Sequence, residues 1–241
     1  MRINVYISST GYCSRRQADR LIQEKRVTIN GKMAQIGQEI TEADTLTIDG
    51  RPLQRRKQTV YLAYHKPRGI ESTTDQTKPH NIIDAVGYPE RIFPIGRLDK
   101  DTSGLILLTN DGQIVNQILR KEFAHEKEYL VEVQKAIDPE FVKHMETGVV
   151  IYNPVRHEKT TTLPTKISVL KQTTFRIVLT QGLNLQIRRM CEALGNKVVS
   201  LKRIRIMHLE LGTLAVGKYR ELTDNERKVL LESLKQTPKN T

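Results

Sequence analysis

The stretch Gly96-Arg97-Leu98-Asp99-Lys100-Asp101-Thr102-Ser103-Gly104-Leu105 lies between two apolar segments, residues 92–95 and 105–108. Short apolar runs bounded by glycine and proline favour buried strands over helices. The connecting loop carries two acids, two bases and two glycines, whereas a plain hairpin needs only a turn pair such as Asp-Gly. Charged side chains on a loop held by a rigid scaffold are where chemistry tends to occur. We therefore expect the functional site here.

The composition favours a polyanionic partner. The chain has 241 residues, enough for one or two domains, and a net charge of +12. A strongly basic protein suits nucleic acid. The longest apolar run, residues 60–64, is too short to cross a membrane, and no secretory signal segment is predicted. Cys13 and Cys191 lack metal-ligand spacing and are far apart, so we expect no zinc site, no disulfide framework and a reducing cytoplasm.

The first 58 residues predict a small basic module. Ser14 and Gln17 have the spacing of a capping box, which predicts a helix from there to about Lys25. Residues 27–29 predict a strand, and Asn30-Gly31 predicts a type I′ hairpin turn. This segment holds 11 Lys and Arg against 6 Asp and Glu.

The basic residues of this module cluster on the predicted helix start and the hairpin tip. Helix N-terminal N–H groups also favour phosphate. A solvated charged face is the alternative, but clustering on two adjacent elements favours RNA contact. The predicted RNA-contacting residues are Ser14, Arg15, Arg16, Arg20 and Lys32.

Two further motifs lie downstream of the central loop. In the predicted strand 127–133, Tyr129 shares a face with valines, which fits a core position. Arg188 and Arg189 lie in the first turns of a helix after residues 181–184, where the helix dipole disfavours cations. A solvated pair is one interpretation; a local rule broken without local gain also often marks function. Lys202 and Arg203, in a later strand region, are predicted to line an RNA groove.

These motifs resemble those of the pseudouridine synthases that modify ribosomal RNA as single polypeptides. The matches are the central loop, Lys127-x-Tyr129-x-Val131 and residues 182–190, Gly-x-Asn-x-Gln-Ile-Arg-Arg-Met. Residues 2–50 resemble the S4 RNA-binding module. Leu185 departs from the family, which often has a basic residue there.

The resemblance implies a role for each matched residue. Asp99 is the expected catalytic carboxylate, paired with Arg188. Tyr129 is expected to stack on the target base and Ile187 to pack against the uracil. We assign Arg97 to holding the RNA, because it lies two residues before Asp99. Arg189 is expected to contact RNA.

The chemistry implied by the resemblance isomerises uridine to pseudouridine. It rearranges atoms without redox change, so we expect no cofactor and no metal. An ionised carboxylate can serve as nucleophile or as base, and it needs a nearby positive charge to stay ionised in a site emptied of water. The target base must be flipped out of its stack, because it is inaccessible there.

The implied fold is α+β. We expect an S4-like domain at 1–50, a basic linker at 51–58 and a catalytic domain at 59–241 with a mixed, mainly antiparallel central sheet. Within the family that includes RsuA, RluB, RluE and RluF, residues 125–131 and 181–195 indicate the RluF-like branch. That branch implies 23S ribosomal RNA as partner and a tRNA anticodon as a further target. We expect a monomer.

Two alternatives remain. A non-catalytic RNA-binding ribosome-assembly factor needs only the S4-like module and the charge, but it leaves the central loop, Tyr129 and Arg188 unexplained. A metal-dependent phosphoryl-transfer enzyme would use Asp99 and Asp101 as a D-x-D pair. No third ligand with convincing spacing accompanies that pair.

Overall fold

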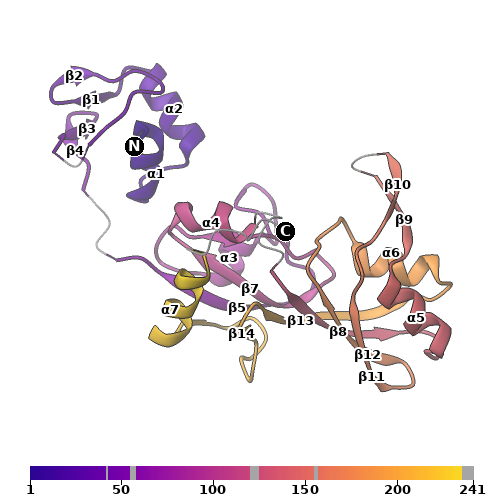
Figure 1. Cartoon of the computed structure of the whole chain (residues 1–241). Helices are drawn as coiled ribbons and strands as arrows, with labels where there is room; N and C mark the ends of the chain where they lie inside the picture. Colours follow the sequence, from indigo (N-terminus) through magenta and orange to yellow (C-terminus); the bar gives the residue numbers. More distant parts are fainter. Residues whose placement is uncertain (42, 55–57, 120–124, 155–156, 235–241) are drawn as a thin grey trace. The chain divides into compact units, whose positions relative to one another are not determined.

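The computed structural model describes residues 1–41, 43–54, 58–119, 125–154 and 157–234 (Figure 1). The chain forms two compact units. One comprises Met1–Val60 with Pro89–Ile92 and Thr109–Gln113; the other comprises Tyr61–Tyr88, Phe93–Leu108 and Ile114–Thr241. Within the described residues, no helix has the length and apolar character needed to cross a membrane.

The N-terminal module packs two helices on a four-stranded antiparallel sheet of order β2-β1-β3-β4. Its elements are α1 (Ile3–Ser9), α2 (Arg15–Gln23), β1 (Val27–Ile29), β2 (Lys32–Met33), β3 (Leu46–Ile48) and β4 (Arg51–Pro52). The predicted capping box of Ser14 and Gln17 is present. Asn30 and Gly31 both have positive φ, at 50° and 77°, which confirms the predicted hairpin turn.

One predicted boundary needs correction. Residues 51–58 were expected to form a linker, but Arg51 and Pro52 pair with Ile48 and Thr47 and so belong to the sheet. The signal was Asp49-Gly50, a hairpin turn in which both residues have positive φ. Residues 55–57 of the predicted linker and 235–241 of the predicted catalytic domain lie outside the described residues.

The second unit is built on a nine-stranded sheet whose main order is β11-β12-β8-β13-β7-β5-β15. Strands β7 and β13 run parallel, whereas β11–β12, β12–β8, β8–β13 and β5–β15 run antiparallel. The predicted α+β class with a mixed, mainly antiparallel sheet is therefore confirmed. Strands β9 and β10 form a separate two-stranded ribbon that extends away from the long sheet (Figure 1).

The bounds of these elements are as follows. The strands are β5 (Tyr61–Lys66), β6 (Phe93–Ile95), β7 (Ser103–Thr109), β8 (Lys127–Val133), β9 (Val150–Asn153), β10 (Glu158–Thr161), β11 (Lys166–Lys171), β12 (Thr174–Leu179), β13 (Val198–Ile206), β14 (Leu209–Glu210) and β15 (Tyr219–Glu221). The helices are α3 (Ile82–Val86), α4 (Gly112–Leu119), α5 (Pro139–Thr147), α6 (Gln186–Ala193) and α7 (Asp224–Ser233).

Two hydrophobic clusters hold this unit together. One joins β8, β12 and β13 to helices α5 and α6, with Phe141 and Phe175 in edge-to-face contact. The other joins β5 and β7 to α4 and α7. Both strands that flank the central loop belong to the second cluster, since Ile95 and Leu105 are buried in it. The loop is thus anchored at both ends to a rigid core.

Candidate active site

The main chain of the central loop is held by a turn and by a buried serine. The N–H of Thr102 donates to the carbonyl oxygen of Asp99 at 3.0 Å. Ser72 is buried, its hydroxyl donates to the Leu98 carbonyl at 2.8 Å, and it accepts from the Leu98 N–H at 3.0 Å. These bonds place the backbone on both sides of Asp99 in one conformation.

Lys66, the last residue of β5, supports the loop with its side-chain ammonium group. Its side chain is completely buried, and Nζ donates to the carbonyl oxygens of Pro67 at 2.8 Å, Ile70 at 2.8 Å and Lys100 at 3.4 Å. Burial lowers the pKa of Lys66 to about 8, while the nearby carboxylates of Asp99 and Asp101 favour its charged form. These bonds make Lys66 a support of the loop.

Gly104 lets the loop enter β7 directly beside β13. A Cβ atom on this glycine would lie 2.2 Å from the main-chain oxygen of Arg203, and its φ is +109°. Only glycine fits both the conformation and the approach. The parallel pairing of β7 with β13 therefore depends on the second glycine of the loop.

This support leaves the acidic side chains of the loop available. Asp99 and Asp101 are exposed, and neither carboxylate makes a hydrogen bond or ion pair to any residue that the structure describes. Arg97 is exposed as well. Across the described ranges, no three His, Cys, Asp or Glu side chains gather where a metal ion would bind, so the D-x-D hypothesis finds no third ligand there.

Arg188 reaches the loop from α6. Its Nη2 donates to the main-chain oxygen of Asp101 at 3.0 Å. The predicted pair with the carboxylate of Asp99 is not among the ion pairs of the described residues. The guanidinium therefore anchors the main chain of the loop at Asp101, two residues after Asp99.

Sheet register brings Tyr129 to the same end of the sheet. Tyr129 on β8 is opposite Arg203 on β13, and Arg203 is opposite Gly104 on β7. Adjacent strands lie about 4.8 Å apart, so Tyr129 lies roughly 10 Å from Gly104. Tyr129 is partly buried against the cluster that contains Ile187. Ile187 is only 4% exposed and forms core.

One predicted RNA contact needs correction. Arg203 is 4% exposed, and its Nε donates to the main-chain oxygen of Leu105 at 2.7 Å. Its guanidinium is buried in the sheet, so it is not placed to contact RNA. Lys202, its neighbour, is half-buried. Burial, and then repulsion from Arg203, lowers the pKa of Lys127, whose Nζ donates to the His125 carbonyl at 3.0 Å.

Arg189 makes two structural contacts. Its Nη2 donates to the side-chain oxygen of Asn184 at 2.9 Å, and its Nη1 donates to the main-chain oxygen of Tyr152 on β9. It thus joins α6 to the β9–β10 ribbon. In the N-terminal module, Arg15, Arg16, Arg20 and Lys32 are all exposed. The hydroxyl of Ser14 accepts from the Gln17 N–H as a helix cap.

Several residues of the site were not singled out from the sequence. Ser72 and Lys66 act through main-chain oxygens that are distant in sequence or arranged by the fold. No residue pattern reports such contacts. Pro67 followed by Gly69 is a local signal for a turn after β5, but it does not indicate these contacts.

The loop, the tyrosine strand and the arginine helix meet at one end of a mixed sheet that follows a small basic module. A family model described as RNA pseudouridylate synthase matches residues 60–193, and an S4 domain model matches residues 1–46. The chain belongs to the RNA pseudouridine synthase family, whose members are isomerases.

Individual relatives indicate the branch of the family to which the chain is most similar. The dual-specificity RNA pseudouridine synthase RluF of Salmonella typhi is 48% identical over 227 residues, which cover 93% of this chain and 76% of the relative. The ribosomal large subunit pseudouridine synthase B of Bacillus subtilis is 37% identical over 95% of both chains. The chain is thus more similar to the RluF enzyme, as predicted. A crystal structure of a pseudouridylate synthase superposes with a TM-score of 0.69 and 31% identity, over 95% of this chain and 99% of that one.

Proposed function

We propose that this enzyme converts a uridine of 23S ribosomal RNA to pseudouridine, with Asp99 as the catalytic carboxylate, and that a tRNA anticodon uridine is a second target. The observation that carries the proposal is the exposed Asp99 carboxylate, which makes no hydrogen bond or ion pair among the described residues, on a loop whose main chain is held by Ser72, Lys66 and Arg188. Preorganised loops of this kind aim a reacting group at its substrate. The name of the Bacillus subtilis relative supports a target in large-subunit ribosomal RNA, and the term dual-specificity in the name of the RluF relative supports a second target.

The reaction breaks the N1–C1′ bond, turns the uracil and joins C5 to C1′, while one proton leaves C5 and one is gained at N1. The carboxylate of Asp99 acts as nucleophile or as base, and both roles need it charged and accessible. The guanidinium of Arg188 bonds the main chain of Asp101 and so helps to hold the loop that carries this carboxylate. No redox partner is required, because the substrate and the product are isomers.

The remaining site residues hold the RNA in this proposal. The ring of Tyr129, partly buried against the core, offers one face to the flipped base, and Ile187 supports it from within the core. Arg97 contacts the backbone of the flipped nucleotide. Further contacts come from Arg189, Lys202 and the N-terminal residues Ser14, Arg15, Arg16, Arg20 and Lys32. The enzyme acts as a monomer in the cytoplasm.

The test is pseudouridine mapping at single-nucleotide resolution. Ribosomal RNA and tRNA from cells that lack the protein are compared with RNA from cells complemented with wild type, Asp99→Ala or Asp101→Asn. We expect wild type and Asp101→Asn to restore one modified position, and Asp99→Ala to leave it unmodified. Asp101→Asn is the matched control, because Asp101 lies in the same loop and Arg188 bonds only its main chain.

Product formed equally by wild type and Asp99→Ala would reject the catalytic assignment. An unchanged map in cells lacking the protein would favour the RNA-binding assembly factor instead.

A further inference from the structure

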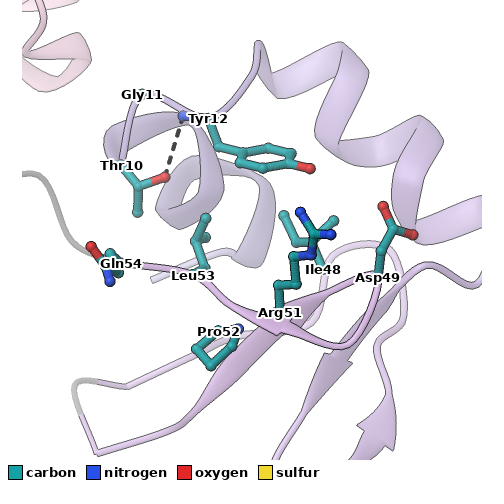
Figure 2. A pocket seen from close by; sticks show the side chains of 9 residues that line it. All are labelled: Thr10, Gly11, Tyr12, Ile48, Asp49, Arg51, Pro52, Leu53 and Gln54. Atoms are coloured by element: carbon teal, nitrogen blue, oxygen red, sulfur yellow. Dashed lines mark hydrogen bonds between the residues drawn. The ribbon is translucent and has the colours of Figure 1, made fainter.

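The N-terminal module contains a surface hollow that the catalytic site does not use. It has a volume of about 730 Å³ and lies between the loop after α1 and strand β4 with the residues that follow it. The nine lining residues are Thr10, Gly11, Tyr12, Ile48, Asp49, Arg51, Pro52, Leu53 and Gln54 (Figure 2). This volume is within the range of about 300–1,000 Å³ typical of ligand sites.

One wall of the hollow is an exposed aromatic ring. Tyr12 is 51% exposed although it is one of the larger apolar side chains of the module. Its main-chain N–H donates to the hydroxyl of Thr10 at 3.4 Å, so the backbone that carries the ring is tied to the end of α1. A planar ring left in water on a held backbone is suited to stack on another planar group.

The hollow also carries the guanidinium of Arg51. Arg51 extends from β4 toward the side of the hollow where the Tyr12 ring lies (Figure 2). Its acidic neighbour Asp49 is occupied, because Arg26 donates to both Asp49 oxygens at 2.9 and 2.7 Å. These bonds from Arg26 are the main reason that the pKa of Asp49 is lowered. Arg51 contributes to that lowering by its charge, but it makes no hydrogen bond or ion pair with the residues that the structure describes.

Three other residues that line the hollow are apolar. Ile48 is buried in the core of the module, and Leu53 packs against that core. Pro52 adds a third apolar surface. An aromatic ring, apolar lining residues and a guanidinium whose hydrogen-bond donors are unused among the described residues match the three parts of a nucleotide: a flat base, a sugar and a phosphate.

We propose that this hollow binds one unpaired nucleotide of the RNA substrate, with the base stacked on Tyr12 and the phosphate held by Arg51. The inference rests on the proposed function, since it concerns how that RNA is held. RNA is favoured over an acidic peptide because the exposed Tyr12 ring can stack on a base; the net charge of +5 on residues 1–58 and the basic start of α2, three residues after Tyr12, suit its phosphates. In this proposal, the RNA strand that contacts Arg15 and Arg16 continues into the hollow.

The test is equilibrium RNA binding by the full-length protein, followed by fluorescence anisotropy. The probes are a labelled single strand of about 12 uridines and a blunt RNA duplex of equal length. We expect Tyr12→Ala to weaken single-strand binding about tenfold, the size of one base stack, and to change duplex binding less than about twofold. Tyr12→Phe keeps the ring and should bind like wild type.

Two further variants complete the design. Ile36→Ala removes an equally exposed apolar side chain elsewhere in the module and should leave both affinities unchanged. Arg51→Ala should reduce the slope of log affinity against log salt by about 0.7, the value of one single-strand phosphate contact, whereas Tyr12→Ala should leave the slope unchanged.

The proposal is overturned if Tyr12→Ala weakens single-strand binding less than about fivefold, or if the duplex loses as much as the single strand. These binding results do not depend on turnover. Failure of the hollow therefore leaves the Asp99 assignment standing, and product formation by Asp99→Ala would leave the hollow standing.

Discussion

Single residues of the central loop have separable tasks. Asp99 presents a carboxylate, whereas Lys66, Ser72 and Arg188 bond to main-chain oxygens of the loop or its flanks. The supporting residues are therefore positioning residues, and their substitution should move the loop without removing the reacting group. Gly104 also positions the loop, because only glycine fits both its positive φ and the close approach of the Arg203 main chain.

The first prediction concerns Gly104→Ala. The added Cβ would meet the main-chain oxygen of Arg203 at 2.2 Å, and φ of +109° is already strained for alanine. We expect the free energy of unfolding to fall by about 3 kcal/mol or more, because neither the backbone nor the partner strand can give way cheaply. Urea denaturation measures this change.

Gly217→Ala is the matched control for that prediction. Gly217 also has positive φ, at +75°, but a Cβ there would meet nothing within 4 Å. Gly217→Ala should lower the free energy of unfolding by only about 1–2 kcal/mol, because alanine is strained at positive φ but meets no steric clash there. Equal losses in the two variants would show that the approach of β13 is not what requires glycine at position 104.

At the scale of elements, helix α6 connects the loop to the β9–β10 ribbon. Arg188 bonds the loop, and the next residue, Arg189, bonds both Asn184 and the main chain of β9. Adjacent arginines on one helix thus face two different partners. A shift of this helix would move both at once.

The second prediction separates two roles of Arg189. If Arg189 holds the ribbon in place, Arg189→Lys and Arg189→Ala should loosen it equally, because an ammonium group cannot replace the two divergent hydrogen bonds of a planar guanidinium. We expect hydrogen exchange of the β9 amides to rise by a similar factor in both variants. If Arg189 only contacts phosphate, the lysine variant should keep wild-type exchange and most of the RNA affinity.

The third prediction concerns the cap of α7. Arg220 donates to both oxygens of Glu226 at 2.7 Å, and these bonds are the main reason that the pKa of Glu226 falls to about 2. A lowered carboxyl pKa stabilises the fold above the ordinary value of 4.5, and this contribution is lost as pH falls toward 2. We expect Glu226→Gln to cost about 1–3 kcal/mol at pH 7.

Thermal unfolding from pH 7 to pH 2.5 measures that contribution. The gap between wild type and Glu226→Gln should narrow as the pH falls below 4.5. Glu232→Gln, an exposed position on the same helix, should show no gap at any pH. A gap that stays constant down to pH 2.5 would contradict the assigned cause.

At the scale of the whole molecule, the proposed function assigns RNA affinity to the positive charge and chemistry to the loop. The net charge of +12 is spread over both units. The exposed basic side chains of the N-terminal module include Arg15, Arg16, Arg20 and Lys32. Phosphate contacts release counterions, so they appear in the salt dependence of binding and not in the chemical step.

The fourth prediction uses that separation. Replacing Arg15, Arg16, Arg20 and Lys32 together by alanine should reduce the slope of log affinity against log salt by about 3 while kcat stays unchanged. The control removes four exposed lysines from the other unit, Lys143, Lys171, Lys197 and Lys228. An equal fall in slope for both sets would mean that net charge, and not this surface, attracts the RNA.

The sequence alone determined features whose causes are local. The capping box at Ser14 and the Asn30-Gly31 turn each involve groups within four residues, and both were predicted correctly. The loop that carries Asp99 was also recognised, because its charges and glycines are contiguous. The family and the α+β class followed from motifs of this kind.

Tertiary structure decided the features that depend on distant partners. Arg203 was predicted to contact RNA and Arg188 to pair with the Asp99 carboxylate, but Arg203 bonds Leu105 inside the sheet and Arg188 bonds a main-chain oxygen. Burial depends on which strands become neighbours, and the parallel pairing of β7 with β13 joins residues about a hundred positions apart. No local pattern records that pairing, so only the folded chain shows which cations are buried as supports and which remain free for RNA.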